Sequence, residues 1–114
     1  MAVPEPVTSA QPRPVVVTLP AEIDMATADG VYTQITAEFA RGTQVVIADM
    51  AATTFCDTLG TRALVHAYHR AAEVGSELRL LMPSPGIMRV WKVLGVVAVL
   101  PIYHSLEEAM AGVR

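Results

Sequence analysis

The run Val45–Ala48 constrains the fold more than any other feature, because it is wholly apolar, rich in β-branched residues and free of polar alternation. A strand with this pattern is buried on both faces, as in a parallel sheet that helices cover on each side. Two similar runs, Val15–Leu19 and Leu78–Met82, are predicted to be strands of the same sheet. A fourth strand is expected within Val97–Ile102, at an edge of the sheet because Pro101 lacks a backbone N–H.

Helical patterns separate these strands. The first helix is predicted to run from Thr27, a suitable cap, to Arg41, with Gly42 as the stop. Its apolar stripe recurs at helical spacing: Ala28, Val31, Ile35 and Phe39. The second helix is predicted to begin near Asp57–Thr58 and to end at Gly75, with the stripe Leu64, Ala67, Tyr68 and Ala71.

Two further helices complete the alternation. A third is expected after Ser84, a good N-cap, and before Gly95, with Trp91 on its inner face or at the rim of the core. The last is short and opens with a capping box, in which Ser105 and Glu108 are the reciprocal pair. Strands that alternate with helices predict an α/β fold with a mostly parallel central β-sheet and flanking helices.

Length and composition fit one domain and favour some partners over others. Residues 1–13 are predicted to be a flexible Pro-rich tail, and residues 14–114 the domain. The single cysteine, Cys56, excludes an intrachain disulfide and fits a reducing, cytoplasmic setting. The net charge of −3 without a Lys/Arg cluster argues against a nucleic-acid partner. The longest apolar stretch, Val93–Leu100, is too short to insert into a membrane.

Motifs typical of enzymes are missing from the sequence. It contains no Gly-rich phosphate loop, no CxxC, no HExxH and no GxSxG. His66 and His69 are three residues apart on one predicted helix, but no third zinc ligand stands out. We therefore expect no catalytic residue, no metal and no cofactor, although sequence alone does not exclude a Ser/His/Asp triad.

The segment Phe55–Gly60 is the most informative for function. It places an acid and a hydroxyl, Asp57 and Thr58, at a predicted helix N-terminus, where unpaired N–H groups and partial positive charge favour a phosphate. The exposed hydroxyl of Thr58 is therefore a candidate for phosphorylation. The alternative is that Asp57 or Thr58 serves only as the N-cap of the helix.

Six segments, taken together and in order, resemble a STAS domain of the anti-sigma factor antagonist family. FCDTLG at Phe55–Gly60 resembles the Asp-Ser-Ser-Gly motif of that family, and VVVTLPAEID at Val15–Asp24 resembles its first strand and Gly-Glu-Leu-Asp turn. The remaining four are Val45–Met50, Gly75–Pro83, Val90–Tyr103 and Ser105–Ala109. The resemblance implies a single STAS-like domain that regulates sigma-factor-dependent transcription by binding other proteins.

The resemblance also implies partners and site residues. Thr58 stands where the family carries its phosphorylated serine, so the implied partners are an anti-sigma factor serine/threonine kinase and a PP2C-type phosphatase. The implied partner-binding residues surround it: Asp24, Asp57, Leu59, Gly60 and Arg62. Thr58 for the first serine, Leu59 for the second and Ala21 for the glycine of the turn are departures from the family pattern.

Two other functions stay open at this point. STAS-like domains also serve as subunits of membrane transport complexes, including lipid ABC transporters, in which Thr58 would contact an ATPase subunit without being modified. A stand-alone hydrolase is the third interpretation, and it predicts a deep pocket with converging polar groups.

Overall fold

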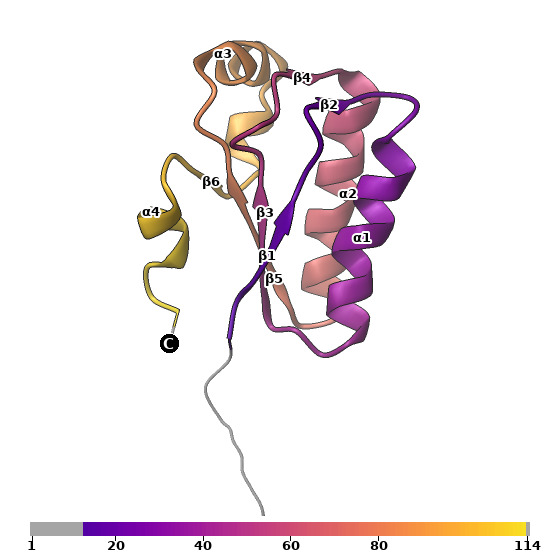
Figure 1. The fold of residues 1–114 in the computed structure, drawn as a ribbon, viewed down its shortest axis with the longest axis vertical. Coiled ribbons are helices and arrows are strands. Elements are labelled where there is room, and N and C mark those ends of the chain that lie inside the picture. The colour runs from indigo at the N-terminus through magenta and orange to yellow at the C-terminus, as the bar shows by residue number, and fades with distance from the viewer. Residues whose placement is uncertain (1–12, 114) are drawn as a thin grey trace, which may run out of the picture.

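The computed structural model describes residues 13–113 as strands and helices that alternate along the chain (Figure 1). The predicted tail therefore lies almost wholly outside the described residues. The elements are β1 (Val15–Thr18), β2 (Glu22–Ile23), α1 (Ala28–Ala40), β3 (Val45–Asp49), β4 (Phe55–Cys56), α2 (Thr58–Glu73), β5 (Glu77–Leu81), α3 (Pro85–Leu94), the 3-10 helix η2 (Val96–Ala98), β6 (Ile102–Tyr103) and α4 (Leu106–Met110).

The main sheet has four strands in the order β1-β3-β5-β6, and every neighbouring pair is parallel. Val46 of β3 is in register with Val15 of β1 on one side and with Leu78 of β5 on the other. The predicted α/β fold with a mostly parallel central sheet is confirmed. Parallel strands need crossover connections, and α1, α2 and α3 supply them.

The helices form layers around this sheet (Figure 1). α1 and α2 pack side by side against one face, α4 lies against the other face, and α3 lies beyond the carboxyl ends of the strands. β3 contributes to the core on both faces, because Val46 and Ala48 belong to the cluster under α1 and α2, whereas Val45 and Ile47 belong to the cluster under α4. The burial of β3 on both faces is what its unbroken apolar run predicted.

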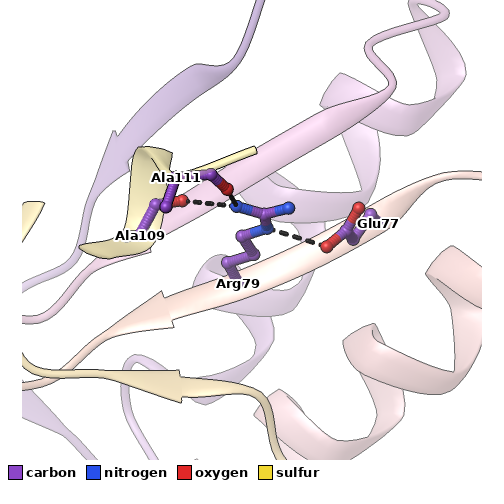
Figure 2. Close-up of polar contacts among 4 residues, drawn as sticks. All are labelled: Glu77, Arg79, Ala109 and Ala111. Carbon is purple, nitrogen blue, oxygen red and sulfur yellow. Dashed lines mark hydrogen bonds and ion pairs between the residues drawn. The ribbon is translucent and has the colours of Figure 1, made fainter. Parts of the chain in front are cut away.

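Arg79 of β5 links α4 to the sheet through hydrogen bonds (Figure 2). Its guanidinium donates hydrogen bonds from one nitrogen to the carbonyl oxygens of Ala109 and Ala111, at 2.9 and 2.7 Å. A second nitrogen donates to the Glu77 carboxylate at 2.7 Å, and the group lies 5.5 Å from the ring centre of Tyr103. Carbonyls that end a helix lack partners within it, so Arg79 satisfies groups that α4 leaves free.

Helix ends follow the sequence predictions at three positions. Ser84 accepts a hydrogen bond from the Ile87 N–H at 3.3 Å, and Gly95 ends α3 in the left-handed conformation, with a φ of 76°. Ser105 accepts from the Glu108 N–H at 3.2 Å. The Glu108 carboxylate in turn accepts the N–H of His104 at 3.1 Å, one residue before the reciprocal position expected in a capping box.

Two local predictions need correction. The predicted edge strand is present, because Ile102–Tyr103 pairs with β5 at the end of the sheet, but it begins only at the last residue of Val97–Ile102, since the chain leaves Gly95 as the helical turn η2. In that turn Val96 and Val97 still pack against the core, so their apolar character does not require a strand. Thr27 stands at the N-cap position of α1, but its hydroxyl accepts the N–H of Asp24 at 3.0 Å and donates to the Glu22 carbonyl at 2.9 Å, so it does not bond an N–H of the first helical turn.

Candidate functional site

A pair of two-residue strands, absent from the sequence predictions, organises the candidate site. β2 and β4 run parallel, with Glu22 in register with Phe55 and Ile23 with Cys56. The N–H of Asp57 then donates to the carbonyl of Ile23 at 3.1 Å. Asp24 and Asp57 follow these strands directly, so the β2–β4 pair brings the two predicted carboxylates to the same end of the fold, near the N-terminus of α2.

Asp57 is the N-cap of α2. Its backbone is extended, and its carboxylate accepts a hydrogen bond from the Gly60 N–H at 2.8 Å. This bond satisfies one of the N–H groups that a helix leaves free at its first turn. Of the two N-cap alternatives that the sequence offered, Asp57 is therefore the cap and Thr58 is not.

Thr58 is the first residue of α2 and is exposed to solvent. Within residues 13–113 its hydroxyl makes no hydrogen bond to another side chain or to the backbone. The adjacent carboxylate of Asp57 is occupied by the cap, so the two side chains have separate roles. An exposed hydroxyl without an internal partner is free to react or to contact a second protein.

Asp24 stabilises the turn that precedes α1. Its carboxylate accepts a hydrogen bond from the N–H of Ala26 at 2.9 Å, and its own N–H donates to the Thr27 hydroxyl at 3.0 Å. The side chain is half-buried. It therefore keeps a fixed position beside the β2–β4 pair while part of it faces solvent.

Gly60 is buried and acts through the absence of a side chain. A Cβ at this position would lie 2.5 Å from the Ile23 carbonyl oxygen and 2.7 Å from the Ile23 Cγ2 atom. Only glycine permits the first turn of α2 to approach β2 this closely. Gly60 thus positions Thr58 and offers no side chain to a partner.

Two grooves lie on either side of the α2 N-terminus. The first, of about 460 Å³, lies between β4 and α3 and is lined by Thr54, Phe55, Cys56, Asp57, Thr58, Gly86, Ile87, Val90 and Leu94. The second, of about 420 Å³, lies between α1 and α2 and is lined by Met25, Ala28, Asp29, Tyr32, Leu59, Arg62, Ala63 and His66. Thr58 and Leu59, adjacent in sequence, line different grooves.

The surface around these grooves is rich in exposed apolar side chains. Phe55 is 50% exposed, Leu59 is 42% exposed and Met25 is 79% exposed. Arg62, which was expected to contact a partner, lies exposed in the second groove together with His66. Exposed apolar surface rimmed by polar side chains is typical of a protein-binding site.

A buried polar contact behind Thr58 joins α2 to α3. The indole N–H of Trp91, fully buried, donates to the Thr61 hydroxyl at 3.0 Å, and the same hydroxyl lies 3.6 Å from the Cys56 sulfur. Burial raises the pKa of the Cys56 thiol; the Thr61 hydrogen bond opposes this and the charge of Asp57 adds to it. Trp91 is thus a core residue, as the sequence suggested.

Thr61 is the member of this group that the sequence interpretation missed. Its side chain is buried although it is polar. The signal was its spacing, because Thr61 precedes Leu64, Ala67 and Ala71 on the apolar stripe of α2. A threonine at an apolar-stripe position needs a buried hydrogen-bond partner, and Trp91 supplies it.

The structure indicates no metal site and no membrane span in the described segment. Among residues 13–113, no three His, Cys, Asp or Glu side chains lie close enough together to hold a metal ion. His66 and His69 are both exposed, and His69 packs near Tyr68 with ring centres 5.8 Å apart. No helix in the same range combines the length and the apolar character needed to cross a bilayer.

The family model described as STAS domain matches residues 5–109. The chain belongs to the STAS domain family. No curated protein matches the chain. The match spans β1 to α4, so the STAS domain includes both grooves and the β2–β4 pair.

Solved structures of other proteins share this fold. An anti-sigma factor antagonist from Mycobacterium paratuberculosis is 26% identical, with 87% of this chain and 84% of that chain covered and a TM-score of 0.76. The Bacillus cell fate determinant SpoIIAA in its phosphorylated form is 24% identical over 96% of both chains, with a TM-score of 0.65. The murine anion transporter Slc26a9 is 18% identical over 90% of this chain but only 18% of its own, with a TM-score of 0.71.

Proposed function

We propose that this STAS domain is an anti-sigma factor antagonist that binds an anti-sigma factor kinase and is switched off by phosphorylation of Thr58. The observation that carries the proposal is the exposed Thr58 hydroxyl, which has no partner within residues 13–113 and stands beside an already capped helix N-terminus. The similarity to the Mycobacterium anti-sigma factor antagonist supports the class of function. The phosphorylated SpoIIAA structure supports the kind of switch.

The two grooves supply the surface for a protein partner. Leu59 and Met25 on one side, and Phe55 on the other, offer apolar area that a partner would remove from water. Arg62 lies among them and offers hydrogen-bond donors to an acidic or carbonyl group of the partner. Thr58 stands between these contacts, so it would lie inside the interface.

A phosphate on Thr58 would weaken such an interface for electrostatic reasons. It adds about −1.5 to −2 charges at neutral pH, which the bound partner would have to desolvate. Asp57 is its sequence neighbour and Asp24 stands at the end of the adjoining strand, so two carboxylates lie at the same end of the fold as the modified group. The N-terminus of α2 attracts the phosphate only partly, because the Asp57 carboxylate already holds the Gly60 N–H.

The exposure of Thr58 also suits reversal of the modification. A PP2C-type phosphatase must reach the phosphate, and the first residue of an exposed helix end is accessible. Thr61, one turn later, is buried and bonded to Trp91, so a kinase would reach Thr58 and not Thr61. In this proposal the chain acts in the cytoplasm by binding proteins rather than by catalysis or by binding nucleic acid.

The test is reconstitution with the candidate anti-sigma kinase of the same organism and ATP. Mass spectrometry should place one phosphate on Thr58, and Thr58→Ala should prevent it while complex formation persists. Thr58→Glu should weaken the complex more than about a hundredfold, which corresponds to about 3 kcal/mol.

Thr33→Glu is the matched control, because Thr33 is an exposed threonine of α1 outside both grooves. A protein that stays unphosphorylated and forms no complex with any anti-sigma kinase would rule out this function.

A second candidate is a STAS-type subunit of a membrane transport complex, such as a lipid ABC transporter, that acts without phosphorylation. The observation in its favour is the shared fold with part of the Slc26a9 anion transporter. In that case the partner would be a transport ATPase, and Thr58 would contact it unmodified. Pull-down with wild-type protein and with Thr58→Glu, read out by partner identity, separates the two: a transport ATPase indicates the second candidate and an anti-sigma kinase the first.

A further inference from the structure

A basic groove lies on α3 away from the Thr58 groove, which is the groove between β4 and α3 that Thr58 lines. It has a volume of about 450 Å³ and is lined by Pro83, Pro85, Met88, Arg89, Lys92 and His104. α3 contributes different residues to each groove, since Val90 and Leu94 face the Thr58 groove and Arg89 and Lys92 line the basic one. The two grooves share no residue.

Three cationic or titratable donors meet in this groove. Arg89 and Lys92 are three residues apart on α3 and therefore project from one side of the helix in a row. His104 joins them from the segment that follows β6. The fold thus brings together basic side chains that the linear sequence keeps apart.

No acidic side chain lines the groove. Within residues 13–113, neither Arg89 nor Lys92 takes part in a salt bridge, whereas Arg70 and Arg79 pair with Glu73 and Glu77. The Glu108 carboxylate contacts the chain beside the groove, where it accepts the backbone N–H of His104 at 3.1 Å. Arg89 and Lys92, both exposed and without a salt-bridge partner in the described residues, make a local positive patch on a chain of net charge −3, and the His104 ring adds a polar group.

The rest of the lining is apolar, from Pro83, Pro85 and Met88. A ligand that fits must therefore carry several negative charges and some apolar surface. A single small anion would form only exposed, screened ion pairs here. Nucleic acid requires a longer basic track than one turn of helix provides. A short peptide with several carboxylates and an apolar side chain matches both parts of the lining.

We propose that the groove formed by Arg89, Lys92, His104 and the apolar residues Pro83, Pro85 and Met88 binds an acidic segment of a partner protein. The carboxylates of the segment pair with the row on α3 and with His104, and an apolar side chain packs on Met88 and the prolines. The site shares no residue with the Thr58 groove, so a test of peptide binding here does not depend on the proposed phosphorylation of Thr58.

The experiment is an NMR titration of the isotope-labelled protein at low salt with a synthetic peptide of glutamates around one central leucine. The expected result is saturable shifts of the Met88, Arg89, Lys92 and His104 signals. The double variant Arg89→Glu/Lys92→Glu should weaken binding by about tenfold or more, since each reversal replaces attraction by repulsion. Raising the salt concentration should weaken the wild-type complex.

The matched control is Arg13→Glu/Arg41→Glu, which changes the net charge equally at exposed positions outside the groove. It should bind the peptide within about twofold of wild type, as should Thr58→Glu. Equal weakening by both double variants, or shifts that map elsewhere, would overturn the proposal. Inorganic phosphate or a single-stranded oligonucleotide that binds at the same residues as tightly as the peptide would overturn the assignment of an acidic peptide.

Discussion

Trp91 donates its indole N–H to the hydroxyl of Thr61 across 3.0 Å in the interior of the protein. The bond joins α3 to the first turns of α2. It therefore fixes one wall of the Thr58 groove relative to the helix that carries Thr58. A buried donor of this kind is costly to leave without an acceptor.

Thr61→Val should consequently destabilise the protein by about 1–3 kcal/mol, because the shape is kept while the Trp91 N–H loses its acceptor. The measurement is urea unfolding followed by the fluorescence of Trp91, the only tryptophan of the chain. Thr33→Val, the same change at an exposed helix position, should stay within about 0.5 kcal/mol of wild type. Equal losses in the two variants would show that the hydrogen bond contributes nothing.

Gly60→Ala and Gly30→Ala should change stability in opposite directions. The new Cβ at Gly60 would meet the Ile23 carbonyl oxygen at 2.5 Å, so α2 must shift and stability should fall by about 1–3 kcal/mol. At Gly30 of α1 nothing lies within 4 Å of the new Cβ, and alanine should add about 0.5–1 kcal/mol. Thermal or urea unfolding measures both. A Gly60→Ala variant as stable as wild type would contradict the close approach of α2 to β2.

The elements found from the sequence are those with long, regular patterns. Val45–Asp49 carries an unbroken apolar run and α2 an apolar stripe at helical spacing, and both patterns are visible without the fold. β2 and β4 are two residues long, and no periodicity exists at that length. Their pairing depends on the approach of α2 to Ile23, a tertiary contact that Gly60 permits and that one sequence does not reveal.

The candidate site was predicted in part for a similar reason. The sequence placed Thr58 and Asp57 at a helix start because caps are local features. It did not separate their roles, since only the 2.8 Å bond from the Gly60 N–H identifies Asp57 as the cap. The basic groove was not predicted, because Lys92 and His104 are distant in sequence and meet only through the position of α3 relative to β6.

Arg79→Met should loosen α4 while leaving the sheet in place. The variant keeps most of the buried stem but removes the donors to the Ala109 and Ala111 carbonyls, so stability should fall by about 1–3 kcal/mol. Amide hydrogen exchange should accelerate most at Leu106–Met110. Glu77→Gln, which alters only the exposed partner of Arg79, should cost less than about 1 kcal/mol. Uniform acceleration across β3 and β5 would contradict a local role.

Cys56 should react slowly with alkylating reagents in the native state. Burial holds the pKa of its thiol above the ordinary value, so little thiolate is present at neutral pH. Iodoacetamide labelling followed by mass spectrometry should be slower for native than for urea-unfolded protein. Equal rates would contradict the raised pKa.

The same raised pKa predicts a loss of stability at alkaline pH. The native Cys56 thiol keeps its proton at pH values where the unfolded chain releases it. Its contribution to the free energy of unfolding is therefore complete below about pH 8.5, the ordinary pKa of a thiol, and is lost as the pH rises through the native pKa. Urea unfolding from neutral to alkaline pH should show a steeper decline for wild type than for Cys56→Ala. If the stability of the two proteins declined equally with rising pH, Cys56 would make no such contribution.

The strand order β1-β3-β5-β6 has a consequence for how the protein is made. Each strand of the main sheet pairs with the strand synthesised just before it, so the sheet can grow in one direction as the chain leaves the ribosome. The β2–β4 pair, and with it the position of Thr58, is complete before β5 is synthesised. The α3 wall, the basic groove and the helix held by Arg79 are added last. Nascent chains stalled after α2 should therefore already display the threonine, without the α3 wall of its groove.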